Sequence, residues 1–254
     1  TYLLSGPRGS VAYLGLGSYA GNYGMSSGRT GETGYLEAKD LTLDDEGNLQ
    51  VLLSVVEPEG AQKTAEGRAL DWLPMEADTS SLIVRQLFLD RGAEAPAELT
   101  LRRVRWEGEA WVDDSEPTPL TCEAIDRGLL SAARLVVGAV GMFTAWSHGF
   151  QKHTNELPLF EQKTALAAHG DPNITYYHGY WQLGPDEALL IETTPPPCDY
   201  WNFQLNNHWM ESLDYRHHRI AINKSQAVYG DDGSVRIVVA HGDPGLPNSG
   251  GRVG

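Results

Sequence analysis

The chain has 254 residues, a length that fits one large domain or two small ones. Its 19 basic and 34 acidic side chains give a net charge of −15 at pH 7, which disfavours binding to nucleic-acid phosphates and to anionic lipid. Hydrophobic residues make up 41% of the chain and charged residues 21%, which is typical of globular proteins. The 28 glycines and 14 prolines favour many short strands with tight turns over a helix bundle.

Residues 1–116 are predicted to form an N-terminal β-rich region. Leu49, Val51, Leu53 and Val55 recur at every second position, so they share one face of a strand. The predicted strands of this region are Val11–Gly17, Tyr35–Leu43, Leu49–Val55, Leu82–Leu89 and Leu99–Val104. The glycine-rich stretch Gly15–Gly34, which holds Tyr19, Asn22, Tyr23 and Met25, is predicted to be a long mobile loop able to cover a pocket.

Residues 117–170 are predicted to form a helical segment. Thr121 is a candidate N-cap, with Glu123 in the first turn. The apolar residues that follow fall on one helical stripe: Ile125, Leu129, Ala132, Ala133, Val136, Val137, Val140 and Phe143. A shorter helix is predicted over Leu159–Ala168. Because Arg134 and several small residues interrupt the weakly polar stretch Gly128–Trp146, no membrane span is predicted there.

Residues 171–254 are predicted to form a C-terminal β-rich region. Its candidate strands are Tyr176–Trp181, Ala188–Glu192, Tyr200–Leu205, Arg219–Asn223 and Val235–Val239. The acidic turn ending at Gly233, with the strand after it, parallels the turn ending at Gly47 and its strand. Either two related sheet units share one plan, or two common hairpins resemble each other by chance. The prediction is a mainly β fold with a helical insert, like a β-sandwich or jelly roll, in which the three regions form one integrated structural unit.

Three long segments of the C-terminal region resemble the bacterial family called domain of unknown function 1214. They are Asn173–Glu192, Tyr200–Asp214 and Asp232–Gly245, and weaker similarity runs through His153–Pro158 and Trp72–Arg85. The resemblance implies a β-sandwich of the jelly-roll kind in a protein that is often oligomeric, and it implies no particular reaction. After Gly245 the chain departs from the family pattern, in which a strand with Trp and Leu follows.

Candidate binding residues gather in the segment after Tyr200. On a strand, Asn202 and Gln204 point to the face of Tyr200, which is too polar for a core and could line a pocket that binds hydroxyl groups or amides. The alternative is a face turned to solvent or to another subunit. Tyr177, Trp181 and Glu211 complete the predicted ligand-binding set. His208 and His241, each near a carboxylate, are the candidate proton-transfer groups, although a histidine bonded to backbone near a turn fits the sequence equally.

Other chemistry has weaker support. His208, Glu211, Asp214, His217 and His218 could supply metal ligands, but their spacing matches no known metal motif, so no metal site is assigned. Nucleophile, phosphate-loop and dinucleotide motifs do not occur, and no cofactor is predicted. Cys122 and Cys198 are expected to be reduced thiols, and the absence of a visible leader favours a cytoplasmic location.

Three functions remain open at this point. The first is the binding or conversion of a small organic molecule, hydroxyl-bearing or lipophilic, in a polar and aromatic pocket of a β-sandwich. The second is a structural assembly module that forms homo-oligomers without catalysis. The third is a metal-dependent enzyme with His and Asp ligands. The expected partners are therefore a small-molecule ligand and further copies of the chain, with neither nucleic acid nor membrane.

Overall fold

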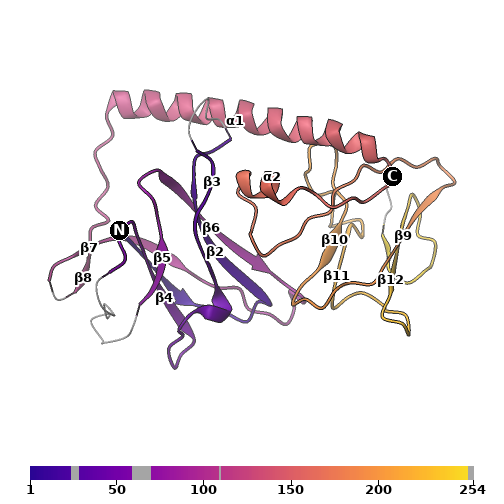
Figure 1. Ribbon diagram of the computed structural model, residues 1–254, viewed down its shortest axis with the longest axis horizontal. Helices are drawn as coiled ribbons and strands as arrows, with labels where there is room; N and C mark the ends of the chain where they lie inside the picture. Colours follow the sequence, from indigo (N-terminus) through magenta and orange to yellow (C-terminus); the bar gives the residue numbers. More distant parts are fainter. Residues whose placement is uncertain (24–28, 59–69, 109, 251–254) are drawn as a thin grey trace. The chain divides into compact units, whose positions relative to one another are not determined.

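A computed structural model describes residues 1–23, 29–58, 70–108 and 110–250 (Figure 1). The chain is mainly β with one long helix inserted along it, as the sequence predicts. It divides into two compact units, and the division differs from the three predicted regions. Unit 1 contains residues 1–138 and 162–174, and unit 2 contains residues 139–161 and 175–254. The predicted helical region is thus shared between the units.

Unit 1 contains a five-stranded sheet in the order β5-β4-β1-β7-β8 and a three-stranded sheet in the order β3-β2-β6 (strands labelled in Figure 1). The strands are β1 (Tyr2–Pro7), β2 (Tyr13–Ala20), β3 (Gly31–Glu37), β4 (Asn48–Ser54), β5 (Asp71–Pro74), β6 (Thr79–Leu87), β7 (Thr100–Trp106) and β8 (Trp111–Asp113). A short 3₁₀ helix, η1 (Ala38–Asp40), follows β3. The strand predicted at Tyr35–Leu43 is thus found earlier in the chain, as β3. It ends at Glu37 because the 3₁₀ helix begins at Ala38.

The two sheets of unit 1 pack face to face. Leu49, Val51 and Leu53 of β4 are buried in one cluster with Leu14 and Leu16 of β2. The predicted shared face of these three leucine and valine residues is confirmed, and Leu52 on the opposite face is buried as well, so both faces of β4 are covered from Val51 onward. Val55, beyond the end of β4, is exposed.

The glycine-rich stretch is not a long loop, which corrects the prediction. Gly15 and Gly17 lie inside β2, and Gly31 begins β3. All of β2 is buried, and a Cβ added to Gly15 would lie 2.8 Å from the phenol oxygen of Tyr35. These glycines leave room for larger side chains on the outer face of the strand. Of the residues between β2 and β3, those described (21–23 and 29–30) lie outside strands, and Met25 lies outside the described residues.

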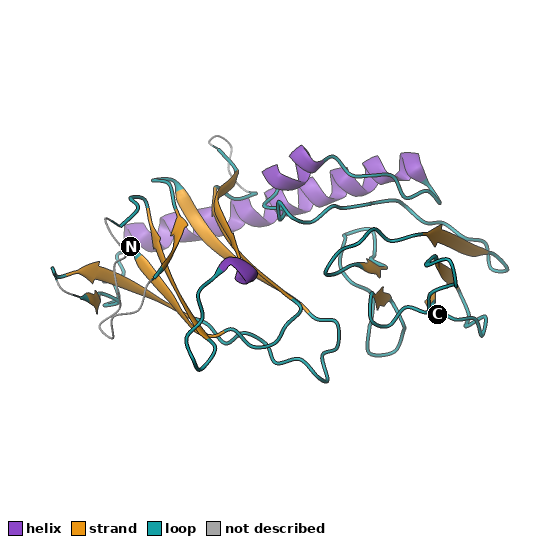
Figure 2. Cartoon of the chain, turned by 60° about the horizontal axis from the view of Figure 1, so that its bottom comes forward, coloured by secondary structure: helices purple, strands orange, loops and turns teal. Residues whose placement is uncertain are grey.

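Helix α1 (Cys122–Phe150) is one continuous helix (Figure 2). Its start agrees with the prediction, because the Ala124 amide donates to the Thr121 hydroxyl at 3.1 Å. A 3₁₀ turn, η2 (Gln151–His153), follows. Helix α2 (Gln162–Ala167) is shorter than the predicted Leu159–Ala168.

Unit 2 contains a three-stranded sheet in the order β13-β12-β9 and the pair β10-β11. Its strands are β9 (Ala188–Thr193), β10 (Asn202–Gln204), β11 (Ala221–Asn223), β12 (Val235–Ala240) and β13 (Ser249–Gly250). The predicted strand Tyr176–Trp181 is wrong: the described segment forms only isolated bridges, Leu159 with Tyr177 and Thr154 with Tyr180. Its backbone partners lie in the segment after α1 instead of in a sheet.

The suggested relation between two sheet units has a structural counterpart. β4 follows Gly47, pairs antiparallel with β1 and pairs parallel with β5. β12 follows Gly233, pairs antiparallel with β9 and pairs parallel with β13. Both glycines have positive φ, 80° and 77°, as a tight turn requires. The local plan is therefore the same in the two units, and it agrees with the first of the two alternatives.

Candidate functional site

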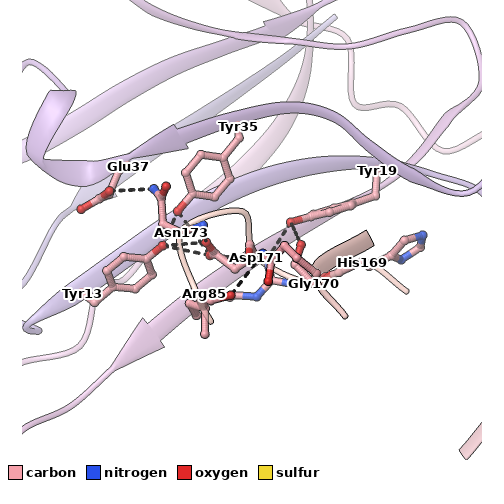
Figure 3. A network of polar contacts seen from close by, with 11 residues as sticks. Tyr13, Tyr19, Tyr35, Glu37, Arg85, His169, Gly170, Asp171 and Asn173 are labelled. Carbon is pink, nitrogen blue, oxygen red and sulfur yellow. Dashed lines mark hydrogen bonds and ion pairs between the residues drawn. The ribbon is translucent and has the colours of Figure 1, made fainter. Parts of the chain in front are cut away.

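A buried polar network joins the outer face of β2 to the segment after α2 (Figure 3). At its centre lies Asp171, which is 0% exposed. The Tyr13 hydroxyl lies 3.0 and 2.9 Å from the two carboxylate oxygens, and the Tyr35 hydroxyl donates to one of them at 3.2 Å. The two phenol oxygens also contact each other. Both tyrosines thus direct their polar atoms at one carboxylate.

Arg85 of β6 closes the other side of the network. Its guanidinium lies 3.9 Å from the Asp171 carboxylate and donates to the Tyr19 hydroxyl at 2.8 Å. It also donates to the His169 carbonyl. The His169 ring in turn contacts the Ala20 carbonyl at 3.0 Å. A buried carboxylate, a cation and three tyrosines therefore satisfy one another.

The electrostatics of this network keep its hydrogen bonds in place. Burial, followed by the contacts with the neighbouring phenol and Asp171, raises the pKa of Tyr13 far above its ordinary value. Burial likewise raises the pKa of Tyr35. Both phenols stay neutral and keep donating, and the complete burial of Asp171 keeps its carboxylate away from solvent. The network holds residues 169–174 against the sheet, and its geometry fits structural support better than catalysis.

The sequence analysis missed this network. A usable signal was present in β2, where Tyr13, Gly15, Gly17 and Tyr19 alternate with buried apolar residues. Two tyrosines separated by two glycines mark a strand face that another segment must cover. A second signal was Arg85 inside an apolar strand. The burial of Asp171 could not be predicted from its sequence context, because Asp171 followed by Pro172 is typical of an ordinary turn.

The polar face of β10 forms as predicted, and it is exposed. Asn202 and Gln204 point outward, while Phe203 and Leu205 point into the core of unit 2. The amide of Gln204 donates to Asn206 at 2.8 Å, and the amide of Asn202 donates to the Tyr200 hydroxyl at 3.2 Å. These side chains satisfy one another along a single face. The predicted pocket over them remains a prediction.

The other predicted site residues are dispersed. Tyr177 is 56% exposed, and Trp181 packs against the apolar core around Leu205. His208 is exposed beside Trp209, and His241 contacts the Leu183 carbonyl at 3.3 Å. Glu211 accepts from the Asn207 amide at 2.9 Å. Within the described part of the chain, no hydrogen bond, ion pair or aromatic ring contact that we identify links two members of the predicted set.

Two further observations bear on unit 2. A cavity of about 10 Å³ lies against Phe203 and Leu205, on the apolar side of β10, where it has room for about one water. Ligand pockets have volumes of roughly 300–1,000 Å³. Among the residues described, no group of three or more His, Cys, Asp or Glu side chains could hold a metal ion. The metal-dependent alternative therefore gains no support from this geometry.

An aromatic cluster holds the C-terminal end of α1 in unit 2. His178 stacks on Phe150, with ring centroids 5.1 Å apart, and meets Phe160 edge-on at 4.9 Å. Trp146 packs against Phe160 at 5.0 Å. Because burial disfavours the charged imidazolium, the pKa of His178 lies below its ordinary value of 6.5.

This histidine makes the stability of unit 2 pH-dependent. In the unfolded chain His178 takes up a proton as the pH falls through about 6.5, whereas the lowered pKa in the folded cluster means that the ring takes it up only at a lower pH. Its stabilising contribution is complete above that pH and is lost as the pH falls through it. We expect the wild-type chain to lose more stability between pH 7.5 and 5 than His178→Phe does, measured by urea unfolding. Equal losses would show that the ring is not protected from protons.

The first half of α1 has an apolar surface without cover. Leu129 is 66% exposed, Val136 63% and Val137 74%, while Ile125 and Val140 are about half exposed. The segment 122–153 is long and apolar enough to cross a membrane by length and composition, and none of its most apolar stretch is buried. The predicted absence of a membrane span therefore stays a prediction.

Comparison with known proteins gives one informative relative. No family model and no curated protein matches the chain. An uncharacterized protein from Burkholderia cenocepacia has a solved structure that is 40% identical and has a TM-score of 0.88. The match covers 100% of the present chain, which spans 66% of that protein. The two share one fold.

A second solved structure, from Vibrio parahaemolyticus, is 12% identical with a TM-score of 0.40, over 98% of this chain and 77% of that one. That similarity is too low to carry an argument. The resemblance to domain of unknown function 1214 stays a prediction.

Proposed function

We propose that this chain is a non-catalytic assembly module that buries the exposed surface of α1 against another polypeptide. The observation that carries the proposal is the exposure of Leu129 and Val136, which lie on the side of α1 opposite Arg134. Soluble proteins rarely leave a contiguous apolar surface of this kind in water, and such a surface marks an interaction site. The second of the three functions is therefore the best supported.

The energetics favour such burial. Fully burying one Leu or Val side chain contributes about 1.5–3 kcal/mol, so each half-exposed side chain of α1 contributes about 1 kcal/mol when covered. Covering such a surface on two partners contributes on the order of 10 kcal/mol. Association costs about 4–15 kcal/mol before any surplus appears as affinity. The gain is of the same order as the cost, so association requires that most of the surface, including its alanines, is covered.

Two features favour a polypeptide over a lipid bilayer as the covering surface. The uncharged stretch from Leu135 to Ser147 has a length of about 20 Å at 1.5 Å per residue, against about 30 Å for a hydrocarbon core. Arg134 lies at one end of this stretch and His148 at the other. The net charge of −15 also opposes binding at an anionic membrane surface.

Binding of a small molecule at Asn202, Gln204 and His208 stays a second proposal of lower rank. What favours it is the row of amide groups that β10 presents to the outside. What disfavours it is that the partners identified for these side chains in the described chain are Tyr200, Asn206 and Trp209, none of which belongs to the predicted ligand set.

A test of the assembly proposal uses thiol alkylation. Val136→Cys and Arg134→Cys are made separately in a chain whose Cys122 and Cys198 are serine. Both positions are exposed in the single chain, so a free helix gives equal rates. We expect Cys at position 136 to react at least tenfold more slowly at working concentration, with a native mass above that of one chain. Equal rates and a single-chain mass would contradict the assembly function.

A further inference from the structure

We infer that the occupant of the α1 surface is the same surface of a second copy of this chain, with the two helices antiparallel. This inference rests on the proposed assembly function and adds a partner and an orientation. The exposed seam is defined here as Ile125, Leu129, Ala132 and Val136.

The exposed seam continues along α1 into a row of residues that is already packed within unit 2. Its residues are spaced alternately by four and three, as in a coiled coil. The same spacing continues through Ala139, Phe143, Trp146 and Phe150. Phe150 and Trp146 pack against Phe160, so the C-terminal half of the seam has a partner within its own unit. One helix thus carries a single packing seam of which the N-terminal half is uncovered.

The exposed apolar area of α1 can be compared with the area that a dimer interface buries. At about 25 cal/mol per Å², the burial energy of a Leu or Val corresponds to roughly 60–120 Å². The large apolar side chains on the seam's side of α1 are Ile125, Leu129, Val136, Val137 and Val140, and their exposed fractions then correspond to roughly 200–350 Å². Specific interfaces bury about 600–1,000 Å² per partner. These side chains therefore supply part of the area of such an interface, and Ala132, Ala133 and the residues next to them have to supply the rest.

The α1 surfaces of two copies complement each other when the helices run antiparallel. Pairing Leu129 with the partner's Val136 brings Ile125 opposite the partner's Val140, which lies beside the seam one turn after Val136. Ala132 then lies at the centre opposite the partner's Ala133, where small side chains allow close approach. The charged residues of α1 within this overlap then meet uncharged positions. Glu123 and Asp126, in particular, lie across from the stretch after Ala139, which holds no charge up to His148. Parallel helices would instead bring both acidic N-terminal turns together, and their dipoles would repel.

Native mass spectrometry and cross-linking of the full chain test the antiparallel pairing. We expect the wild-type protein to have the mass of two copies, or an even multiple, at tens of micromolar. Leu129→Glu/Val136→Glu should give a single-chain mass with an unchanged circular dichroism spectrum, because both side chains are exposed and their replacement disturbs no core. Arg134→Glu is the matched control: it makes the same change in net charge on the opposite side of α1, and should keep the wild-type mass.

Orientation is read with a bismaleimide whose arm is shorter than about 10 Å, the usual spacing of packed helices. In a chain with both native cysteines replaced by serine, Ala132→Cys should cross-link between copies and Arg134→Cys should not. With its native thiols, Cys122 should not cross-link to the partner's Cys122, because antiparallel pairing separates the two by about 30 Å.

The outcomes separate the inference from the proposed function. A multimeric mass without cross-linking at position 132, or with cross-linking at Cys122, overturns the antiparallel pairing and leaves assembly in place. A multimer that survives Leu129→Glu/Val136→Glu also overturns it. A single-chain mass for the wild type, together with rapid alkylation at position 136, overturns both.

Discussion

Replacing Asp171 by alanine is expected to destabilise unit 1 by about 3–5 kcal/mol, the usual cost of removing one partner from a buried charge pair. The carboxylate receives two phenol hydroxyls and lies 3.9 Å from the guanidinium of Arg85. Its removal takes one buried carboxylate away from Arg85 and removes the acceptor of two hydroxyls. Segment 169–174 should then detach from the outer face of β2, and this face should take up water.

Urea unfolding followed by hydrogen exchange and mass spectrometry checks this prediction, because peptides from the two units can be followed separately. Protection should fall in β2, β3 and β6 and remain unchanged in β9 and β12. Asp45→Ala, at an exposed carboxylate of the same unit, is the control and should shift the midpoint very little. Asp171→Asn keeps the size and one acceptor oxygen, so its loss should be intermediate. If Asp171→Ala matched the control, the network would add nothing to stability.

The sequence predicted those parts of the fold that depend on local patterns. Alternation along β4 and the stripe along α1 were correct because each depends on residues within a few positions of one another. The outer face of β2 was misjudged because its glycines indicate a loop unless a distant segment fills the space above them. That segment is centred on Asp171, which is far away in the chain. Periodicity identifies a face, but not what covers it.

The same limit applies to the candidate site. The alternation through Asn202 and Gln204 predicted correctly which side chains share a face, yet the exposure of that face depends on tertiary packing. Tyr176–Trp181 has the aromatic composition of a strand, and this composition misled the prediction. Its partners lie in the segment of residues 153–160, and the ring of His178 is held by Phe150 and Phe160. The segment Tyr176–Trp181 is therefore held by packing of the His178 ring against Phe150 and Phe160 and not by pairing in a sheet.

Gly179→Ala is expected to destabilise unit 2 by about 3 kcal/mol, at the upper end of the cost of overpacking. A Cβ at this position would overlap the backbone carbonyl of Glu156, and a backbone atom cannot move aside as a flexible side chain can. The segments on either side are tied to each other, since the Asn155 amide donates to the Tyr180 carbonyl at 2.6 Å. Relief of the overlap therefore has to separate them, and the ring of His178 loses its contact with Phe150.

The matched control is Gly242→Ala, in the same unit, because a Cβ there meets nothing within 4 Å. It should change the unfolding midpoint by a few tenths of a kcal/mol at most, since removing a glycine mainly reduces the entropy of the unfolded chain. Hydrogen exchange should open residues 153–160 and 175–181 in Gly179→Ala alone. A Gly179→Ala protein as stable as the control would mean that these two segments are not held in contact, and the low pKa of His178 would then lose its physical cause.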